Sequence, residues 1–527
     1  MKYFLTLFSL GMFSATTLMG QAKVRKLPNT INHPSINVYA PYMSFDANAL
    51  LFLSDNNEDN ALSIYYTFKE NADWKDPVVA PKNVNSKFNF LRGYALSADG
   101  KKMYFSSLKS PGVGGYDILM SEFKGNTWSE PQNFGVPINT KGNEATPSFT
   151  FDGNTLYFMR CDKMNADKAE ACKIFVTKKK STGQWEEPVE LPATINTGNS
   201  QTPRIMADGE TLIFSSDKFQ SKGGMDLYVT KLVNGNWNTP VPLDFVNTDK
   251  DDQYVSVNAL GRYLLKDAQG VKKSEILEYL IPDVIRPRGM MKLSGTVKDP
   301  TGAVIPAYVS VVDLTTKKRI FNGRPAADGS ILLYLMEGSK YELTIDPEQS
   351  EFSYYSKQFD LTSDKIPQGE KVAAVLKRVE VGDELALDLV KFKNYSDELD
   401  PSCYDELKRL ARVIKKSPQL KFEVQVLLTG YLEDSVQSNP DLTERVQESI
   451  QTQYDDIDSL GQLYKHDTVI VRTTYNNDRT LLQAQAIINY LVSQGIDASS
   501  LGSFGNAIAA TLPENKKTVI RVAVRKK

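Results

Sequence analysis

Four tryptophans, the complete set in this sequence of 527 residues, impose a period on its first half. They are Trp74, Trp128, Trp185 and Trp237, so the successive gaps are 54, 57 and 52 residues. Each tryptophan is followed three residues later by proline. A large aromatic residue that returns at nearly constant spacing is typical of a repeat architecture, in which each unit buries its apolar surface against its neighbours.

The same order of features surrounds each tryptophan. A turn, usually Asp-Gly, precedes a short apolar run, and the Trp-x-x-Pro segment follows. Asp-Gly favours a hairpin because Gly tolerates positive φ and Asp bonds its own turn. The turns and their apolar runs are Phe45-Asp46 with 50–52, Asp99-Gly100 with 103–105, Asp152-Gly153 with 156–158, Asp208-Gly209 with 212–214 and the divergent Leu260-Gly261 with 263–265.

Several short strands in a unit of about 50 residues are typical of a β-propeller blade. The fifth unit lacks Trp-x-x-Pro, but residues 26–32 (Lys-Leu-Pro-Asn-Thr-Ile-Asn) resemble residues 190–196 (Glu-Leu-Pro-Ala-Thr-Ile-Asn), which follow Trp185. We therefore predict a five-bladed propeller over residues 24–285, in which the N-terminal strand completes the last blade and removes the exposed sheet edges. A β-sandwich or an open solenoid with the same strand pattern is the alternative.

Residues 1–20 predict export from the cytoplasm. Met1-Lys2, an apolar run to about Met12 and small residues up to Gly20 form the pattern of a secretory signal peptide, with cleavage expected before Gln21. No cysteine lies near that boundary, so a lipoprotein anchor is not expected, and no later stretch approaches 18 apolar residues, so no transmembrane segment is expected. The net charge of −2 gives no indication of nucleic-acid binding.

The three cysteines bear on the compartment and on metal binding. Cys161 and Cys172 flank a polar turn of the third unit, and in an oxidising compartment they favour a disulfide across a hairpin. Two free, half-buried thiols are the alternative. Cys403 is left over before a predicted helix. With only two histidines, His33 and His466, the chain offers too few ligands for a structural zinc site, and we expect no metal and no cofactor.

A second module is expected over residues 291–378, after a linker at 286–292. Strand-like runs and turns alternate there, and about seven strands in about 85 residues predict a small β-sandwich. Several of its residues match the pattern of a known family. The matching residues are Gly295, Val297, Asp299, Ile305-Pro306 and Asp328-Gly329. This stretch resembles the carboxypeptidase-regulatory-like family, and the resemblance implies a structural spacer or interaction module without catalytic activity.

Residues 385–527 predict a mixed α+β domain. Apolar residues at helical spacing indicate helices over 401–416 and 480–493. Apolar runs indicate strands over 387–392, 421–428 and 518–524, which gives the order β-α-β-α-β.

This end of the chain resembles the OmpA C-terminal family of peptidoglycan-holding periplasmic domains. The resemblance is carried by residues 417–424, 476–496 and 515–517. It implies that one Asp and one Arg hold the diaminopimelate of the peptide stem, since a carboxylate suits its ammonium and a guanidinium suits its carboxylate.

This sequence departs from the family pattern at both positions. The Asp position falls on Thr429 and the Arg position on Gln483, and an insertion at about 430–474 separates them. Asp478 and Arg479 are the candidates that could supply surrogate charges for peptidoglycan. The alternative is that they form the N-cap and turn before the helix.

The order of the three modules suggests a role in the cell envelope. A propeller resembling the TolB/WD-like kind, a regulatory-like sandwich and an OmpA-like end together resemble periplasmic accessory proteins of the type IX secretion and gliding machinery. We expect a non-catalytic scaffold in the periplasm, associated with the outer membrane or cell wall, that binds an envelope protein and associates with peptidoglycan or another envelope protein. The alternatives are a glycan- or peptide-binding receptor that uses the propeller channel and, less favoured because nucleophile and base pairs are absent, a propeller hydrolase.

Overall fold

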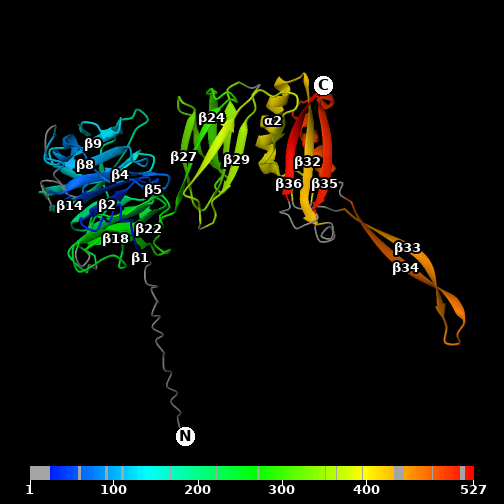
Figure 1. The fold of residues 1–527 in the computed structure, drawn as a ribbon, viewed down its shortest axis with the longest axis horizontal. Coiled ribbons are helices and arrows are strands. Elements are labelled where there is room, and N and C mark those ends of the chain that lie inside the picture. The colour runs from blue at the N-terminus through cyan, green and yellow to red at the C-terminus, as the bar shows by residue number, and fades with distance from the viewer. Residues whose placement is uncertain are drawn as a thin grey trace, which may run out of the picture. The chain divides into compact units, whose positions relative to one another are not determined.

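The computed structural model describes residues 24–527 except for short segments at 57–60, 89–92, 109–111, 167, 220–221, 270–272, 350–351, 364, 394–395, 433–443, 477–478 and 511–516. The predicted signal peptide, residues 1–20, therefore lies outside the described residues. The chain divides into two compact units, one of Met1–Lys292 with Lys365–Gln368 and one of Leu293–Asp364 with Gly369–Lys527 (Figure 1). In the described part of the chain, no helix has the length and apolar character needed to cross a membrane.

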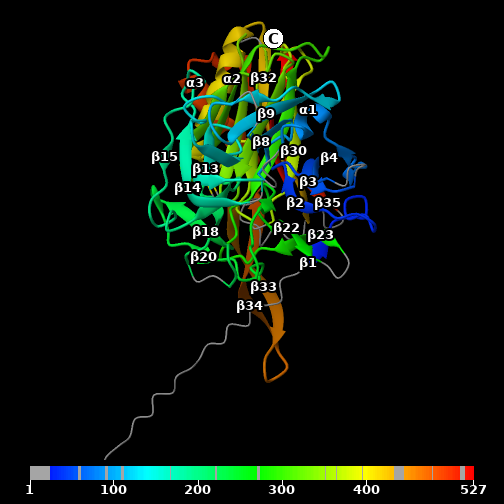
Figure 2. The same ribbon diagram turned by 90° about the vertical axis from the view of Figure 1, so that its left-hand side faces the viewer.

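The first unit is a five-bladed β-propeller, so the predicted fold class is confirmed and the sandwich and solenoid alternatives are wrong. Figure 2 shows its sheets arranged in a ring. One short helix, α1 (Lys82–Asn85), follows the first blade. The strands of the five blades are β2 (Tyr39–Met43), β3 (Ala49–Ser54), β4 (Ser63–Glu70), β5 (Asp73–Trp74) and β6 (Val78–Val79); β7 (Ala95–Leu96), β8 (Lys102–Ser107), β9 (Asp117–Lys124), β10 (Thr127–Trp128) and β11 (Gln132–Asn133); β12 (Asn143–Phe149), β13 (Thr155–Met164), β14 (Ala169–Lys178) and β15 (Val189–Glu190); β16 (Ser200–Ile205), β17 (Thr211–Ser216), β18 (Asp226–Val233), β19 (Asn236–Trp237) and β20 (Val241–Pro242); and β21 (Ser256–Val257), β22 (Tyr263–Gln269) and β23 (Ser274–Leu280) with β1 (Val24–Lys26).

The ring is closed by the N-terminal strand. β1 pairs antiparallel with β23, and Val24, Arg25 and Lys26 lie opposite Tyr279, Glu278 and Leu277. The fifth blade thus takes its outer strand from the opposite end of the unit. Since β23 would otherwise present an unpaired edge, this pairing protects it from other strands.

One asparagine side chain performs the same task in every blade. Its Oδ1 accepts from the backbone N–H of a residue in the third strand, and its Nδ2 donates to the C=O of that same residue, so two buried backbone groups are satisfied at once. The pairs are Asn85 with Ile64, Asn139 with Ile118, Asn196 with Ile174, Asn247 with Leu227 and Asn32 with Ile276. Because Asn32 serves the fifth blade, residues 26–32 occupy the place that residues 190–196 occupy in the third.

The tryptophans lie at the seams between blades. Trp128, which is 2% exposed, contacts Tyr66 of the preceding blade with ring centroids 5.8 Å apart. Trp185 lies 6.2 Å from Phe134, and Trp237 lies 6.3 Å from Tyr157. The repeat of Trp-x-x-Pro therefore reflects a repeated packing task, since aromatic pairs contribute about 0.5–1.5 kcal/mol beyond their buried area.

The second unit begins with a seven-strand β-sandwich. One sheet has the order β27-β24-β30 and the other β26-β25-β28-β29. Alternating burial along β25 directs every second side chain into the core, as expected for a sheet with one covered face. The strands are β24 (Met290–Lys298), β25 (Ala307–Asp313), β26 (Lys318–Gly323), β27 (Ser330–Met336), β28 (Lys340–Pro347), β29 (Tyr355–Asp360) and β30 (Gly369–Val375).

The α+β domain has a four-stranded sheet of order β31-β36-β32-β35, with two helices that contribute to its apolar core. Apolar side chains of both helices enter that core, Leu407 and Leu410 from the first and Ile487 and Leu491 from the second. Its elements are β31 (Glu384–Ala386), η1 (Pro401–Cys403), α2 (Tyr404–Lys416), β32 (Leu420–Leu432), α3 (Arg479–Ser493), η3 (Ala498–Ser500), β35 (Leu501–Ala510) and β36 (Lys517–Lys526).

Two expectations for this domain were wrong. The strand expected at 387–392 lies earlier, at β31, because Leu387, Leu389 and Val390 are buried from a turn and not from a paired strand. A strand between the second helix and the last strand was missed altogether. That strand, β35, runs parallel to β32. It carries glycine where α3 approaches, since a Cβ on Gly505 would lie 2.2 Å from the backbone N of Leu481.

The predicted insertion at 430–474 contains a long hairpin. β33 (Glu444–Ile457) and β34 (Leu463–Asn476) pair antiparallel and form a sheet of their own. A two-stranded ribbon is only marginally stable alone. This ribbon is labelled in Figure 1.

Candidate functional site

A pocket of about 470 Å³ in the α+β domain contains the predicted Arg position. Gln483 and Arg479 line it from α3, one helical turn apart, so that their side chains share one face. Leu428 of β32 and Ile520 of β36 supply apolar wall. The segment between β31 and η1 supplies the opposite wall, with Asp388 among its residues.

The other predicted site residues are placed less fully. Thr429 belongs to β32, opposite Lys517 of β36, but its side chain lies outside the described residues. Asp478 also lies outside them. Arg479 is the first residue of α3 and lines the pocket, whereas Gln483 donates from Nε2 to the Ser396 carbonyl at 3.1 Å. Gln483 therefore closes one wall by binding the backbone of the loop opposite.

Charges of both signs line this pocket. Asp388 is an exposed carboxylate, and the cations are Lys391, Lys393 and Arg479. Lys393 pairs with Glu398, and its pKa is raised by that hydrogen bond. Lys391 donates to Gln358 Oε1 at 2.7 Å. Asp388 was not predicted as a site residue, because it lies in the apolar run at 387–392 that predicts a strand.

Such a lining can hold a ligand that carries an ammonium and a carboxylate. Asp388 offers the acceptor for the ammonium, and Arg479 offers a planar donor for the carboxylate.

The axis of the propeller is occupied by one side chain. Arg204 of β16 is 4% exposed, and its guanidinium donates to the carbonyls of Val255, Pro147 and Tyr94 at 3.1, 3.1 and 2.9 Å. Its Cζ also lies 4.3 Å from the centre of the Tyr42 ring. These partners come from the four other blades, so a single arginine joins all five.

Irregular backbone precedes two of these three carbonyls. The innermost strands of three blades each carry a non-glycine residue at positive φ, namely Ala40, Thr146 and Thr202 with φ of 48°, 50° and 48°, and Tyr254, just before β21, has a φ of 55°. All three strands show a register shift at that point. A bulge reorients the backbone locally, and the carbonyls of Pro147 and Val255 directly follow such residues. A ligand that enters the channel would meet Arg204 and its partners at this level.

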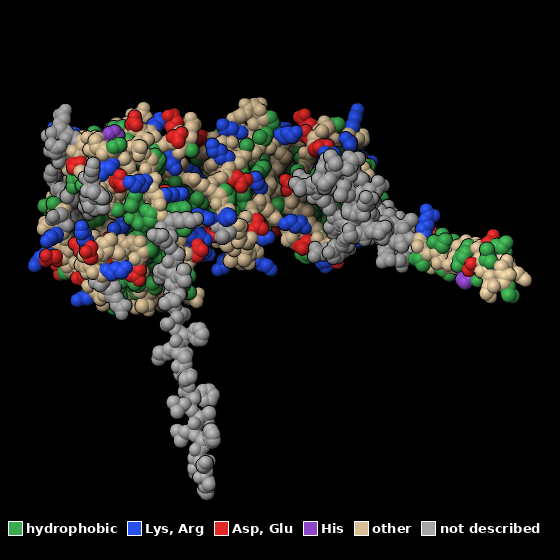
Figure 3. Space-filling model, turned by 60° about the horizontal axis from the view of Figure 1, so that its bottom comes forward, with side chains coloured by type: hydrophobic (Ala, Val, Ile, Leu, Met, Phe, Trp, Pro, Cys, Tyr) green, Lys and Arg blue, Asp and Glu red, His purple; other side chains and the backbone are tan. Residues whose placement is uncertain are grey.

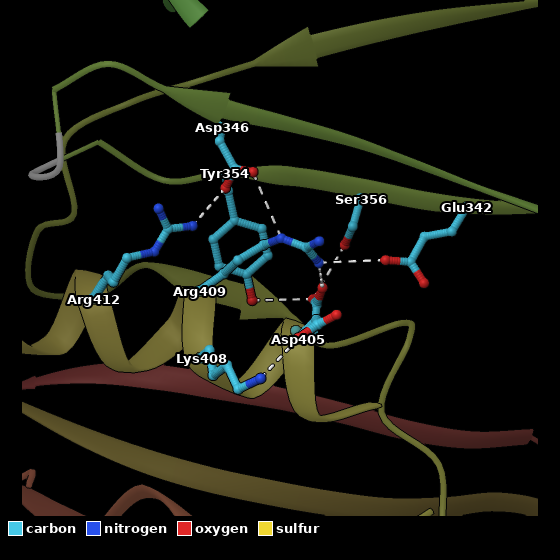
Figure 4. A network of polar contacts seen from close by, with 9 residues as sticks. Glu342, Asp346, Tyr354, Ser356, Asp405, Lys408, Arg409 and Arg412 are labelled. Atoms are coloured by element: carbon cyan, nitrogen blue, oxygen red, sulfur yellow. Dashed lines mark hydrogen bonds and ion pairs between the residues drawn. The ribbon is translucent and has the colours of Figure 1, made fainter. Parts of the chain in front are cut away.

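A second buried polar cluster joins the sandwich to α2 (Figure 4). Glu406, 1% exposed, accepts from Tyr354 Oη at 3.0 Å and from Ser356 Oγ at 3.1 Å. Arg409 lies 3.4 Å from Glu406 and from Glu342 of β28. Burial raises the pKa of Glu406 to about 7, and Arg409 opposes that shift only in part. We call this group of residues the junction cluster.

The junction cluster extends along the helix. Asp346 accepts from Arg412 at 2.8 Å and lies 3.7 Å from Arg409 Nε. Burial is also the main cause of the raised pKa of Glu342. All the charges are engaged with one another, which identifies the cluster as a structural junction and leaves no group directed at a ligand.

Cys161 and Cys172 are joined by a disulfide between paired positions of β13 and β14. Cys403 is free and buried. Within the described ranges, no three residues of His, Cys, Asp or Glu gather as a metal site requires.

Comparisons with known proteins give distant structural likenesses only. No protein-family model matches the sequence, and no curated protein does. A TolB candidate from Agrobacterium tumefaciens is 13% identical, with a TM-score of 0.29, over 57% of this chain and 90% of its own. The oligogalacturonate lyase of Vibrio parahaemolyticus is also 13% identical, with a TM-score of 0.29, over 52% of this chain and 96% of its own. A chain of a nidogen/laminin complex is 11% identical, with a TM-score of 0.28, over 56% of this chain and 95% of its own.

Proposed function

We propose that this protein is a non-catalytic scaffold of the bacterial envelope whose α+β domain holds the peptide stem of peptidoglycan. The observation that carries the proposal is the pocket in which Asp388 and Arg479 line a volume of about 470 Å³. A diamino acid with a free carboxylate presents the two opposite charges that these side chains complement.

Arg479 replaces the missing family arginine in this proposal. It precedes Gln483 by one helical turn, so a longer guanidinium side chain from that position covers the same face of α3. Asp388 takes the role of the missing family aspartate from a different wall. The carboxylate and the guanidinium that hold the peptide stem in this proposal thus come from two residues outside the family positions.

The propeller and the sandwich act as platform and spacer. Propeller faces are rigid surfaces that carry loops, and loops carry binding. The rival function, a glycan or peptide receptor that uses the propeller channel, is less favoured because Arg204 and Tyr42 occupy the axis. The more specific proposal concerns the partner and is an accessory role in type IX secretion. It rests on the order of the three modules.

Retention of the mature protein on purified peptidoglycan sacculi tests the proposal. We expect wild type to sediment with sacculi and Arg479→Ala or Asp388→Ala to bind about 10-fold more weakly, since one charge-assisted hydrogen bond contributes about 1.5–3 kcal/mol. Arg525→Ala is the matched control, because Arg525 lies in the same domain and is half exposed against Glu423. Gln483→Arg restores the family residue and should strengthen retention.

Equal retention of wild type and Arg479→Ala would contradict the pocket assignment. If wild type itself is not retained, the peptidoglycan role fails, and another envelope protein becomes the expected ligand of this domain. Activity of the wild-type protein on a glycan or peptide would contradict the non-catalytic role.

A further inference from the structure

One seam of the propeller differs from the others. At the seam between the fifth and first blades, Trp74 has no aromatic partner among the residues that the structure describes. It lines a pocket of about 500 Å³ instead. In the fifth blade the three-residue strand β1 stands where the other blades carry a Trp-x-x-Pro segment.

The floor of this seam pocket is apolar. Its charged lining consists of three cations, Arg25, Lys69 and Arg262, and two carboxylates, Asp73 and Glu278. Leu27, Met43 and Ala47 belong to the buried cluster beneath it. Lys69 Nζ lies 4.8 Å from the centre of the Trp74 ring. Within the described part of the chain Lys69 has no ion pair. Burial is the first cause of its lowered pKa, and the carboxylates of Glu278 and Asp46 oppose that shift only in part. A carboxylate arriving beside Lys69 would offset that desolvation.

The rim contains further cations. Arg25 lies 3.7 Å from the centre of the Tyr263 ring and pairs with Glu278, and Arg262 lines the same pocket. The pocket therefore suits a segment that carries both apolar side chains and carboxylates. Its volume falls in the range of specific binding sites, about 300–1,000 Å³.

The tip of the β33–β34 hairpin carries such a segment. Ile457, Leu460 and Leu463 are 63%, 83% and 74% exposed. Figure 3 shows apolar atoms gathered on this hairpin. Three aspartates, Asp455, Asp456 and Asp458, lie among or beside them. Exposed aliphatic groups on a marginal hairpin are unfavourable in water, so they indicate a contact.

The tip is held in a defined shape before it binds. Asp458 Oδ1 accepts from the N–H groups of Leu460 and Gln462, both at 2.9 Å, and Gly461 has a φ of 79°. A preformed turn loses little conformational entropy on binding. The aspartates also oppose contact with an anionic lipid surface, which attracts basic segments.

We propose that the hairpin tip of one copy of this protein docks into the seam pocket of a second copy. Apolar side chains enter above Leu27 and Met43, and the aspartates meet Lys69. Because the two surfaces differ, the contact is heterologous and leads to a ring or a filament. The tip is small beside a standard interface of about 1,600 Å², so the association should be weak, with a Kd on the order of 1–100 μM.

Sedimentation of the full mature chain over about 1–200 μM tests this contact. We expect the average mass of wild type to rise with concentration. Leu460→Asp at the tip and Lys69→Glu at the pocket should each weaken association at least 10-fold. The matched control is Val471→Asp, since Val471 is 55% exposed on the same hairpin away from the tip. Lys69→Met, which removes the charge without adding another, covers the case in which Lys69→Glu disturbs the blade.

Disulfide trapping locates the contact independently. Thr30→Cys places a thiol in the pocket and Leu460→Cys one at the tip. A mixture of these two variants should form a cross-linked pair of chains more readily than either variant alone, and Val471→Cys should not replace Leu460→Cys.

Three results would overturn the proposal. The first is a monomer at every concentration. The second is association that survives both Leu460→Asp and Lys69→Glu, or that Val471→Asp weakens as much as Leu460→Asp does. The third is binding of the tip to vesicles of phosphatidylglycerol instead, lost on Leu460→Asp. Retention on sacculi depends on neither variant, so this test fails separately from that of the proposed function.

Discussion

Two arginines, one in each unit, are surrounded by acceptors of different kinds. Arg204 in the propeller is surrounded by neutral acceptors, three backbone carbonyls and the Tyr42 ring. Arg409 in the second unit is surrounded by the carboxylates of Glu342, Asp346 and Glu406. Carbonyl acceptors do not titrate, whereas carboxylates do. The contacts of Arg204 should therefore contribute equally to stability at any moderate pH. The contribution of the junction cluster should change with pH.

The four tryptophans allow this contrast to be measured in one chain. All of them lie in the propeller. Indole fluorescence therefore follows the unfolding of the first unit. A transition seen by far-UV circular dichroism without a change in indole fluorescence belongs to the second unit.

The largest effect is expected from Arg204→Met. Loss of the guanidinium leaves three carbonyls buried without a donor, and we expect a loss of about 4 kcal/mol in the free energy of unfolding of the propeller. Urea titration followed by indole fluorescence measures it. The loss in free energy of unfolding should be equal at pH 5.5 and pH 8. A loss that depends on pH would contradict the claim that the acceptors around Arg204 do not titrate.

Arg409→Met should cost about 3 kcal/mol at pH 8, because the buried carboxylates of Glu342 and Glu406 then lose their cation, while Asp346 keeps Arg412. The transition of the second unit should move while the indole signal stays. At pH 5 the loss should be smaller, since the carboxyl groups accept protons and need less compensation. The same loss at both values of pH would contradict the role assigned to the carboxylates.

Glu406→Gln should remove a pH dependence. The pKa of Glu406 is raised to about 7 from an ordinary value of 4.5, so the folded state binds a proton that the unfolded state has released between those two values. The stability of the second unit should therefore decrease as pH rises through that window, by about 3 kcal/mol. Unfolding of wild type and Glu406→Gln at steps from pH 4.5 to 8 should give curves that diverge with rising pH. Parallel curves would mean that Glu406 ionises at its ordinary pKa.

The smallest effects are expected from exposed arginines. Arg412→Met in the second unit and Arg288→Met in the first each break a pair in which the arginine side chain is 60% or 48% exposed. Surface pairs contribute about 0–1 kcal/mol, and losses of that size would separate these exposed arginines from Arg204 and Arg409. A loss above about 2 kcal/mol at either position would show that the exposed fraction of an arginine side chain does not predict its contribution to stability.

Local repetition made the propeller predictable. Each blade repeats a turn, an apolar run and, in four blades, a tryptophan, and each of these signals depends on neighbours in the sequence. The resemblance between residues 26–32 and 190–196 even indicated which end closes the ring. Asn32 shows why that resemblance exists, since it serves Ile276 as Asn196 serves Ile174.

The candidate site was less predictable. The sequence indicated α3 and the position of Gln483, but a helix alone does not say what lies opposite. Asp388 belongs to an apolar run that we expected to be a strand, and burial of Leu387 and Leu389 from a turn decided otherwise. β35 was missed because its glycines weaken strand propensity, although α3 requires one of them at close approach.

The sequence by itself determined the number of blades, the turns that separate their strands and the segment that completes the fifth blade, because these features rest on spacing along the chain. Only the tertiary structure decided that Arg204 occupies the axis, that Glu406 and Arg409 meet Glu342, and that Trp74 faces an open seam. Those contacts join residues that are distant in the sequence, such as Arg204 and Tyr42 about 160 positions apart. Their energies come from burial and geometry, which no local pattern encodes.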